Sequence, residues 1–234
     1  MLSFDLGVQF YIFALNYATF TAKFTLDLTK IKNIIFDLGG VIINIDYNKS
    51  TEAMRKLSRT GSAIEFSQKQ QSNLFDLYET GTSTCHQFRD QLRQEYNLEA
   101  TDEQIDEAWN AMLLDIPAER IELLRELDKT HRLFLLSNTN AIHLIAFNKI
   151  VADSFTIPSL DSLFEKTYYS HLIGQRKPDA VVFEQIVQEN NLNKAETLFI
   201  DDSIQHIVSA KEVGLQTLHL APPLTINEVF RDAL

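Results

Sequence analysis

The sequence predicts an α/β fold in which a doubly wound, Rossmann-like parallel sheet carries an inserted α-helical cap domain. Two observations support this prediction. Beyond residue 30, short and continuously apolar runs alternate with segments of helical period, which is typical of parallel strands that are covered on both faces. Residues 47–116 break that alternation and show helical periods alone. The length of 234 residues is sufficient for one large domain or two small ones with a buried core.

Four apolar runs are the predicted core strands, and helices are expected between them. The strands are expected at residues 34–36, 133–136, 198–200 and 216–220. In the helical segments, apolar side chains recur at spacings of three and four residues, so that they share one face. Such sets are Phe183, Ile186 and Val187 in one segment, and Ile204, Ile207 and Val208 in another.

The insertion is expected to be a bundle of helices between two parts of the core. Thr101 and Gln104 are spaced as a capping box ahead of a helix whose apolar stripe includes Trp109. Pro117 marks the return of the chain to the core. We therefore expect an N-terminal extension of uncertain role at residues 1–30, a core formed by residues 31–46 and 117–234, and a helical cap at residues 47–116.

The first 30 residues differ in composition from the rest of the chain. They hold 18 hydrophobic residues, and their two acidic and two basic side chains cancel in charge. The apolar stretch at residues 7–20 has the length of a signal-peptide core, but Asp5 stands where a basic segment would precede it. It is also too short to span a bilayer comfortably. We interpret residues 1–30 as an extra surface element or an upstream extension of the reading frame, with a secretory signal as the alternative.

The overall charge limits the partners that the chain can have. It contains 21 Lys and Arg residues against 32 Asp and Glu residues, a formal net charge of −11. This balance argues against nucleic acid and against an anionic membrane surface, because both require clustered positive charge. Cys85 is the one cysteine of the sequence, so an intrachain disulfide is impossible and a reducing, cytoplasmic location is expected.

Polar residues follow three of the predicted strands at the points where the strands end. Ligands of open α/β sheets bind beyond the carboxyl ends of the strands, so we expect these side chains to converge. Two glycines follow the first of them and let the backbone approach a ligand closely. The residues are Asp37 with Gly39 and Gly40, Ser137 with Asn138, and Asp201 with Asp202.

Lys177 supplies a further part of this predicted site. Pro178 stands where the next helical period begins, which places Lys177 just before a helix N-terminus that itself favours an anion. Arg176 is the alternative cation, since both side chains could reach the site. Crowded carboxylates next to a lysine indicate a cation site beside an anion site, and Mg²⁺ suits carboxylate ligands together with phosphate oxygens. A carboxylate in such a site can act as a nucleophile on a phosphate ester.

In their order and spacing, these residues resemble the motifs of the haloacid dehalogenase superfamily of aspartate-nucleophile phosphatases over residues 31–220. The insertion resembles the α-helical cap of the C1 subclass, and the motifs are most similar to the α-glucose-1-phosphate phosphatase-like branch. The resemblance implies that Asp37 is the nucleophile, that Gly39, Gly40, Ser137, Asn138 and Lys177 contact the substrate, with Ser137 and Lys177 also catalytic, and that Asp37, the Gly39 carbonyl, Asp202 and, through water, Asp201 hold Mg²⁺.

Gly39 departs from the pattern of most phosphatases in this superfamily. They have a second aspartate two residues after the nucleophile, which serves as general acid and base. General acid–base catalysis contributes about 10²–10⁴-fold to the rate. A sugar that leaves from its anomeric phosphate is a better leaving group than an ordinary alkoxide. We therefore hypothesise that Gly39 accompanies anomeric sugar phosphates or other activated esters.

The predicted function is Mg²⁺-dependent hydrolysis of a small phosphomonoester, a sugar phosphate such as an anomeric hexose phosphate, through an aspartyl-phosphate. One alternative is a metal-independent dehalogenase that uses Asp37 on carbon, and another is a phosphate-binding protein that has lost catalysis. His206 is expected on the surface. The candidates for the substrate pocket are Tyr47, Phe75, Tyr78, Glu79 and Trp109, although the sequence favours the bundle core for the aromatic residues and the surface for Glu79.

Overall fold

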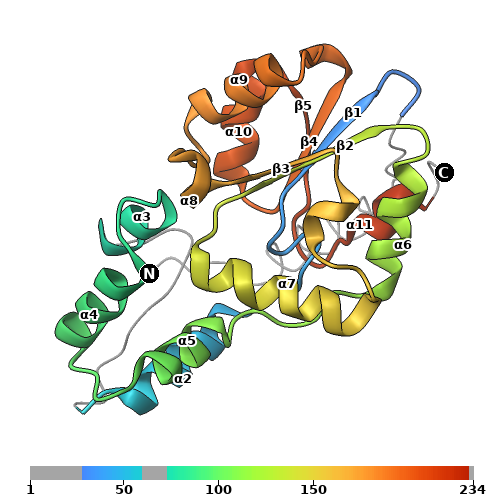
Figure 1. The fold of residues 1–234 in the computed structure, drawn as a ribbon. Helices are drawn as coiled ribbons and strands as arrows, with labels where there is room; N and C mark the ends of the chain where they lie inside the picture. The colour runs from blue at the N-terminus through green and yellow to red at the C-terminus, as the bar shows by residue number, and fades with distance from the viewer. Residues whose placement is uncertain (1–27, 60–72, 232–234) are drawn as a thin grey trace, which may run out of the picture.

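The computed structural model describes residues 28–59 and 73–231. Its core is a five-stranded parallel sheet in the order β3-β2-β1-β4-β5 (Figure 1). The central strand β1 aligns Ile35 with Phe134 on one neighbour and with Phe199 on the other. The predicted α/β parallel-sheet fold is confirmed. The strands are β1 (Asn33–Phe36), β2 (Arg132–Ser137), β3 (Lys166–Tyr169), β4 (Thr197–Asp201) and β5 (Gln216–His219).

Helices cover both faces of the sheet, because successive side chains of a strand point to opposite sides. Ile34 and Phe36 pack in one apolar cluster, and Ile35 packs in another on the opposite face. The first cluster is completed by α6 (Ala118–Leu127), α7 (Ala141–Phe155) and α11 (Ile226–Phe230), and the second by α9 (Ala180–Glu189) and α10 (Ile204–Val213). Figure 1 shows where these helices lie around the sheet. The short α8 (Ser170–Ile173) follows β3.

Two details of the core differ from the prediction. The edge strand β3 is absent from the predicted strands, because its sequence Lys-Thr-Tyr-Tyr contains no apolar run. In α10 the predicted apolar face is wrong for Ile204 and Val208, which are 52% and 49% exposed. The helix packs on the sheet through Ile207 and Ala210 instead. In α9 the predicted face of Phe183, Ile186 and Val187 is buried.

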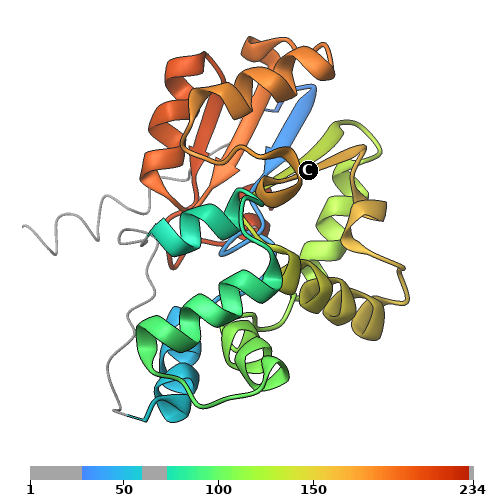
Figure 2. The ribbon, with the colours of Figure 1, turned by 60° about the vertical axis from the view of Figure 1, so that its left-hand side comes forward.

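Between β1 and α6 the described helices pack around a third, separate apolar cluster. Its centre is formed by Phe75, Phe88 and Trp109, whose ring centroids lie 5.4–6.0 Å apart. The predicted capping box of Thr101 and Gln104 is present at the start of the last of these helices. Figure 2 shows the bundle gathered at one side of the sheet. Its helices are α2 (Tyr47–Leu57), α3 (Asn73–Glu79), α4 (Cys85–Tyr96) and α5 (Asp102–Asn110).

The predictions for residues 1–27 lie outside the described residues. The described chain begins at Leu28, whose carbonyl accepts a hydrogen bond from the Ile31 N–H at 2.9 Å and whose side chain packs against the core. Within the described ranges, every helix is too short or too polar to cross a bilayer.

Candidate active site

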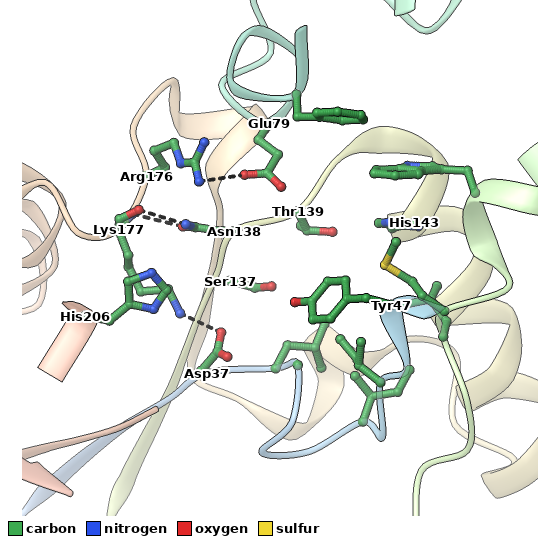
Figure 3. A pocket seen from close by; sticks show the side chains of 18 residues that line it. Asp37, Tyr47, Glu79, Ser137, Asn138, Thr139, His143, Arg176, Lys177 and His206 are labelled. Carbon is green, nitrogen blue, oxygen red and sulfur yellow. Dashed lines mark hydrogen bonds and ion pairs between the residues drawn. The ribbon is translucent and has the colours of Figure 1, made fainter. Parts of the chain in front are cut away.

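Three strands of the sheet end with polar side chains at the same edge. Asp37 follows β1 directly, and its N–H donates to the Ile200 carbonyl at 2.9 Å, which extends the ladder between β1 and β4 by one residue. Ser137 is the last residue of β2, and Asp201 is the last residue of β4. Because the three strands are parallel and in register, these side chains lie together, as Figure 3 shows for Asp37 and Ser137. The predicted convergence of strand ends is therefore present in the fold.

Lys177 is fully buried between two of the carboxylates. Its Nζ donates to Asp37 Oδ1 at 2.6 Å and to Asp201 Oδ2 at 2.6 Å. Asn138 fixes the backbone of this lysine: its side-chain Nδ2 donates to the Lys177 carbonyl at 2.8 Å, and its Oδ1 accepts from the Lys177 N–H at 2.9 Å (Figure 3). Lys177, rather than Arg176, is thus the cation that lies between the strand ends.

The charges at the strand ends are unbalanced without a further cation. Burial raises the pKa of Asp37 to about 8; Lys177 opposes this rise, and Asp201 and Asp202 add to it. Burial alone would lower the pKa of Lys177, but Asp201 and Asp37 outweigh it and raise this pKa. Single oxygens of the three carboxylates all lie within 4.8 Å of one another. Three crowded carboxylates against one buried lysine leave an excess of negative charge.

The donor set at these strand ends fits Mg²⁺, which prefers carboxylate oxygens and retains part of its water shell. Gly40 leaves space for the carboxylate of Asp202, because a Cβ at position 40 would approach Asp202 Oδ2 to 2.5 Å. The backbone of Gly40 also adopts φ 72°, which favours glycine. A glycine at this position therefore allows the Asp202 carboxylate to lie against the loop that follows β1. Asp201 already accepts hydrogen bonds at both oxygens, from Lys177 at Oδ2 and from the Ser203 N–H at Oδ1.

Replacing Gly40 with Ala is expected to weaken Mg²⁺ binding by about 10–100-fold, because Asp202 has to move away from the new methyl group. Isothermal titration with MgCl₂ measures the effect. Gly174→Ala is the matched control: Gly174 has a similar φ of 70°, but nothing lies within 4 Å of a Cβ there. Equal Mg²⁺ affinities of the two variants would mean that Asp202 takes no part in the cation site.

A cavity of about 110 Å³ leads from the strand ends toward the helical bundle. Figure 3 shows Asp37, Ser137 and Lys177 at one side of it and Tyr47 and His143 at the other. The wall contributed by the bundle and by the loops next to it is largely apolar. Besides these residues and others of the strand ends, the cavity is lined by Ile43, Ile45, Phe75, Glu79, Trp109, Met112, Leu113 and Arg176.

Four of the five candidates for the substrate pocket line this cavity. Phe75 and Trp109 line the cavity and also belong to the apolar core of the bundle. For these two residues, both the pocket and the bundle-core interpretation are therefore correct. Tyr78 does not line it, because its ring stacks on Phe88 with centroids 4.0 Å apart. The expectation that Glu79 lies on the surface is wrong: its side chain is 13% exposed, as the structure brings α3 against the core.

Arg176 links the core to the bundle rather than binding at the strand ends. Its Nη2 lies 3.1 Å from Glu79 Oε2 (Figure 3). Arg176 also pairs with Asp76 of the same helix α3. The side chain of Arg176 is 18% exposed, so this contact is largely shielded from water. The two neighbouring basic residues therefore contact different parts of the protein. Lys177 contacts the carboxylates at the strand ends, and Arg176 contacts the helical bundle.

The structure corrects the prediction for His206. Its side chain is only 13% exposed, its Nδ1 lies 2.9 Å from Asp201 Oδ1, and it lines the cavity. His143 and Thr139 line the same cavity and are absent from the predicted site. His206 and His143 each stand third in a helix that follows one of the converging strands. That position, directly above a strand end, is the signal that could have identified both.

The parallel sheet and the polar groups at its carboxyl edge define an α/β protein with a ligand site beyond the ends of its strands. Residues 34–220 match the haloacid dehalogenase-like hydrolases, and the chain belongs to that family. The predicted family is therefore confirmed.

Three relatives illustrate the similarity. The chain is 30% identical over 189 residues to the D-ribitol-5-phosphate phosphatase of Bacteroides thetaiotaomicron, which covers 80% of this chain and 90% of that protein. A crystal structure of a wild-type enzyme of the family from the same organism, with magnesium and inorganic phosphate, has a TM-score of 0.78 and 35% identity over 86% of this chain and 100% of that one. A predicted hydrolase of the family from Porphyromonas gingivalis has a TM-score of 0.70 and 30% identity over 82% and 91% of the two chains. These matches confirm the predicted enzyme class, a hydrolase of phosphate esters.

Proposed function

We propose that this hydrolase is a Mg²⁺-dependent phosphatase of small polyhydroxylated phosphate monoesters, that is, of sugar or polyol phosphates. The observation that carries the proposal is the position of Lys177 Nζ, 2.6 Å from both Asp37 and Asp201, with Asp202 close by and a cavity directly in front. This arrangement offers a nucleophile, a cation site and an anion site within a few ångströms. The named activity of the Bacteroides relative and the magnesium and phosphate in the second relative support the same function.

Asp37 is the proposed nucleophile. Its carboxylate attacks phosphorus, the bond from phosphorus to the ester oxygen breaks, and the alkoxide leaves and takes up a proton from water. Water then attacks the aspartyl-phosphate at phosphorus, which releases inorganic phosphate and restores the Asp37 carboxylate. Lys177 Nζ, the Ser137 hydroxyl and the backbone N–H of Asn138 stabilise the charge that develops on the phosphoryl oxygens, and such electrostatic stabilisation contributes most to the rate. The Gly40 N–H donates to the Ile43 carbonyl at 2.8 Å, so Gly40 serves the site through its backbone shape rather than as a donor to the substrate.

The proposed ligands of Mg²⁺ are Asp37, the carbonyl of Gly39 and Asp202, with Asp201 acting through water. When bound, the ion supplies positive charge to the phosphoryl oxygens as a Lewis acid. The excess of carboxylates over cations at the strand ends favours such an ion. Since Asp201 already accepts hydrogen bonds from Lys177 and the Ser203 N–H, an indirect part suits it better than direct coordination.

We further propose that the helices of residues 47–116 act as a cap over the leaving group and that residues 1–30 are an extension outside the catalytic unit. The bundle contributes Tyr47, Phe75 and Trp109 to the cavity, so a bound ester would be shielded from bulk water on that side. The ion pair of Arg176 with Glu79 joins the cap to the core at the rim of the cavity. The substrate is then a small cytoplasmic metabolite of a size that this enclosed space can hold.

Phosphate release from p-nitrophenyl phosphate, α-D-glucose 1-phosphate and D-ribitol 5-phosphate tests the proposal, each with MgCl₂ and with EDTA. We expect Mg²⁺-dependent release, with kcat/KM higher for one of the two hydroxylated substrates than for the aryl ester. Halide release from a 2-haloacid in EDTA would instead identify a dehalogenase. An absence of phosphate release from every ester would indicate a protein that binds phosphate without catalysis.

The order of the two hydroxylated substrates tests the hypothesis about Gly39. A phosphate on an anomeric carbon has the better leaving group, so α-D-glucose 1-phosphate is hydrolysed faster if the missing aspartate matters. D-Ribitol 5-phosphate is an ester of a primary alcohol. Its faster hydrolysis would mean that Gly39 imposes no requirement for an activated ester.

A further inference from the structure

We propose that His143 determines the substrate class: its Nε2 accepts a hydrogen bond from a hydroxyl group of the leaving alcohol, and Asn110 is the positioning residue that fixes this acceptor. The inference rests on the proposed phosphatase function and deepens it. It states that the enzyme selects phosphate esters whose alcohol carries a further hydroxyl group, and that it disfavours esters of plain alkyl alcohols.

The contact between His143 and Asn110 fixes the protonation of the imidazole. Nδ1 of His143 lies 2.8 Å from the carboxamide oxygen Oδ1 of Asn110. That oxygen is only an acceptor, so Nδ1 carries the proton and the neutral ring holds its lone pair at Nε2. Burial lowers the pKa of His143 to about 3, so the ring stays neutral at physiological pH. The result is a hydrogen-bond acceptor with one fixed tautomer.

The plane of the imidazole is fixed by Trp109. The two rings stack with centroids 4.9 Å apart and an interplanar angle of 12°. The backbone N–H of His143 donates to Asn140 Oδ1 at 3.0 Å, and this hydrogen bond caps the first turn of α7. Trp109 and Asn110 belong to the helical bundle and His143 to the core, so the acceptor is built where the two parts meet.

The cavity is the place where Nε2 meets a ligand. Within the described part of the chain, the His143 ring contacts Asn110 through Nδ1, which leaves Nε2 as the ring nitrogen for a ligand. His143 as a whole is 7% exposed and lines the cavity. A ligand in the cavity therefore meets the side chain of His143.

The position of His143 assigns it to the alcohol rather than to the phosphate. Figure 3 shows it across the cavity from Lys177, whose Nζ marks the phosphate end. Because Nε2 is an acceptor, it pairs with a hydroxyl donor, whereas a methylene, an ether or a carbonyl group would leave it unpaired in a site shielded from water. Sites built to bind a substrate hydroxyl discriminate strongly against analogues that lack it.

The test compares D-ribitol 5-phosphate with pentyl phosphate, which has the same chain length and no hydroxyl group, in the wild type and in three variants. His143→Phe keeps a ring for Trp109 and removes the acceptor. Asn110→Leu removes the partner of Nδ1, and Asn110→Asp retains an acceptor there. We expect the ratio of kcat/KM for the two substrates to fall at least tenfold in His143→Phe and in Asn110→Leu, and to recover in Asn110→Asp, corresponding to the loss of about one hydrogen bond.

p-Nitrophenyl phosphate separates this inference from the proposed function. Its Mg²⁺-dependent hydrolysis by the wild type reports the phosphatase chemistry alone, because its alcohol carries no hydroxyl group for His143 to bind. Mg²⁺-dependent hydrolysis of the aryl ester with an unchanged substrate ratio in His143→Phe would overturn the inference and leave the proposed function intact. An inactive wild type would overturn the proposed function.

Nitrogen NMR of His143 tests the same claim without turnover and without the His143→Phe variant. In Asp37→Asn, Nδ1 is expected to have the chemical shift of a protonated nitrogen and Nε2 that of an unprotonated one. Addition of D-ribitol 5-phosphate is expected to shift the Nε2 signal toward that of a hydrogen-bonded acceptor, and pentyl phosphate is expected to leave it unchanged. A proton on Nε2, or equal responses to the two esters, would contradict the inference.

Discussion

Replacing Asp37 with Asn is expected to lower kcat for phosphate release by at least about 10⁴-fold, the loss typical of removing a nucleophile. The amide oxygen cannot form the aspartyl-phosphate, and one carboxylate ligand of the cation site is lost. Phosphate release from p-nitrophenyl phosphate in saturating MgCl₂ measures the effect. Asp153→Asn is the control, because Asp153 is an exposed carboxylate that pairs with Lys149 at 2.7 Å on the surface of α7.

Asp37→Asn is expected to remain folded, which separates the catalytic loss from a structural one. Lys177 keeps its contact of 2.6 Å to Asp201, and the crowding of three carboxylates is relieved. The melting temperature in EDTA should therefore equal or exceed that of the wild type. Activity within tenfold of the wild type in the folded variant would contradict the assignment of Asp37 as the nucleophile.

Replacing Lys177 with Met is expected to destabilise the protein by about 3–5 kcal/mol, because it leaves buried carboxylates without their cation. Lys177 is fully buried and bridges Asp37 and Asp201 at 2.6 Å each. For a chain of this size the melting temperature should fall by roughly 6–20 °C, and phosphatase activity should be lost as well. Thermal unfolding in EDTA, followed by circular dichroism, measures the change in stability.

Lys166→Met is the matched control for this loss of stability. Lys166 pairs with Glu189 at 2.5 Å, but both side chains are largely open to water at 47% and 36% exposure. Exposed ion pairs contribute little to stability, about 0–1 kcal/mol. If the two lysine variants melted at the same temperature, Lys177 would have no part in balancing the charges of the strand ends.

The strand ends were predictable from the sequence because their signals are local. A buried parallel strand is a short apolar run, and the residue that follows it is at the carboxyl edge of the sheet by definition. Asp37, Ser137 and Asp201 could therefore be brought together without any knowledge of side-chain packing. β3 was not predicted because it lacks this local signal. It is an edge strand with the sequence Lys-Thr-Tyr-Tyr, which contains no continuous apolar run.

The side of the cavity that would hold the leaving group depends on how the helices pack. Helix packing brings together residues that are far apart in the chain, so no local sequence pattern predicts it. His206 lies against the carboxylate of Asp201, and His143 lines the cavity on its bundle side, because of the way α10 and α7 pack on the sheet. Ile204 and Val208 illustrate the same point from the outside: their spacing indicates a buried face, but the helix turns it to solvent. Glu79 is shielded because a helix of the insertion packs against Arg176, a contact between residues far apart in the chain.

In the proposed reaction, Asp37 accepts the phosphoryl group and becomes an aspartyl-phosphate. Rapid acid quench of the enzyme with p-nitrophenyl phosphate and MgCl₂, followed by borohydride reduction and mass spectrometry of the peptides, tests it directly. Reduction converts an aspartyl-phosphate into homoserine, which marks the residue that carried the phosphoryl group. We expect homoserine at position 37 in the wild type and none in Asp37→Asn. Homoserine at another aspartate, or phosphate release that continues in Asp37→Asn without any marked residue, would contradict it.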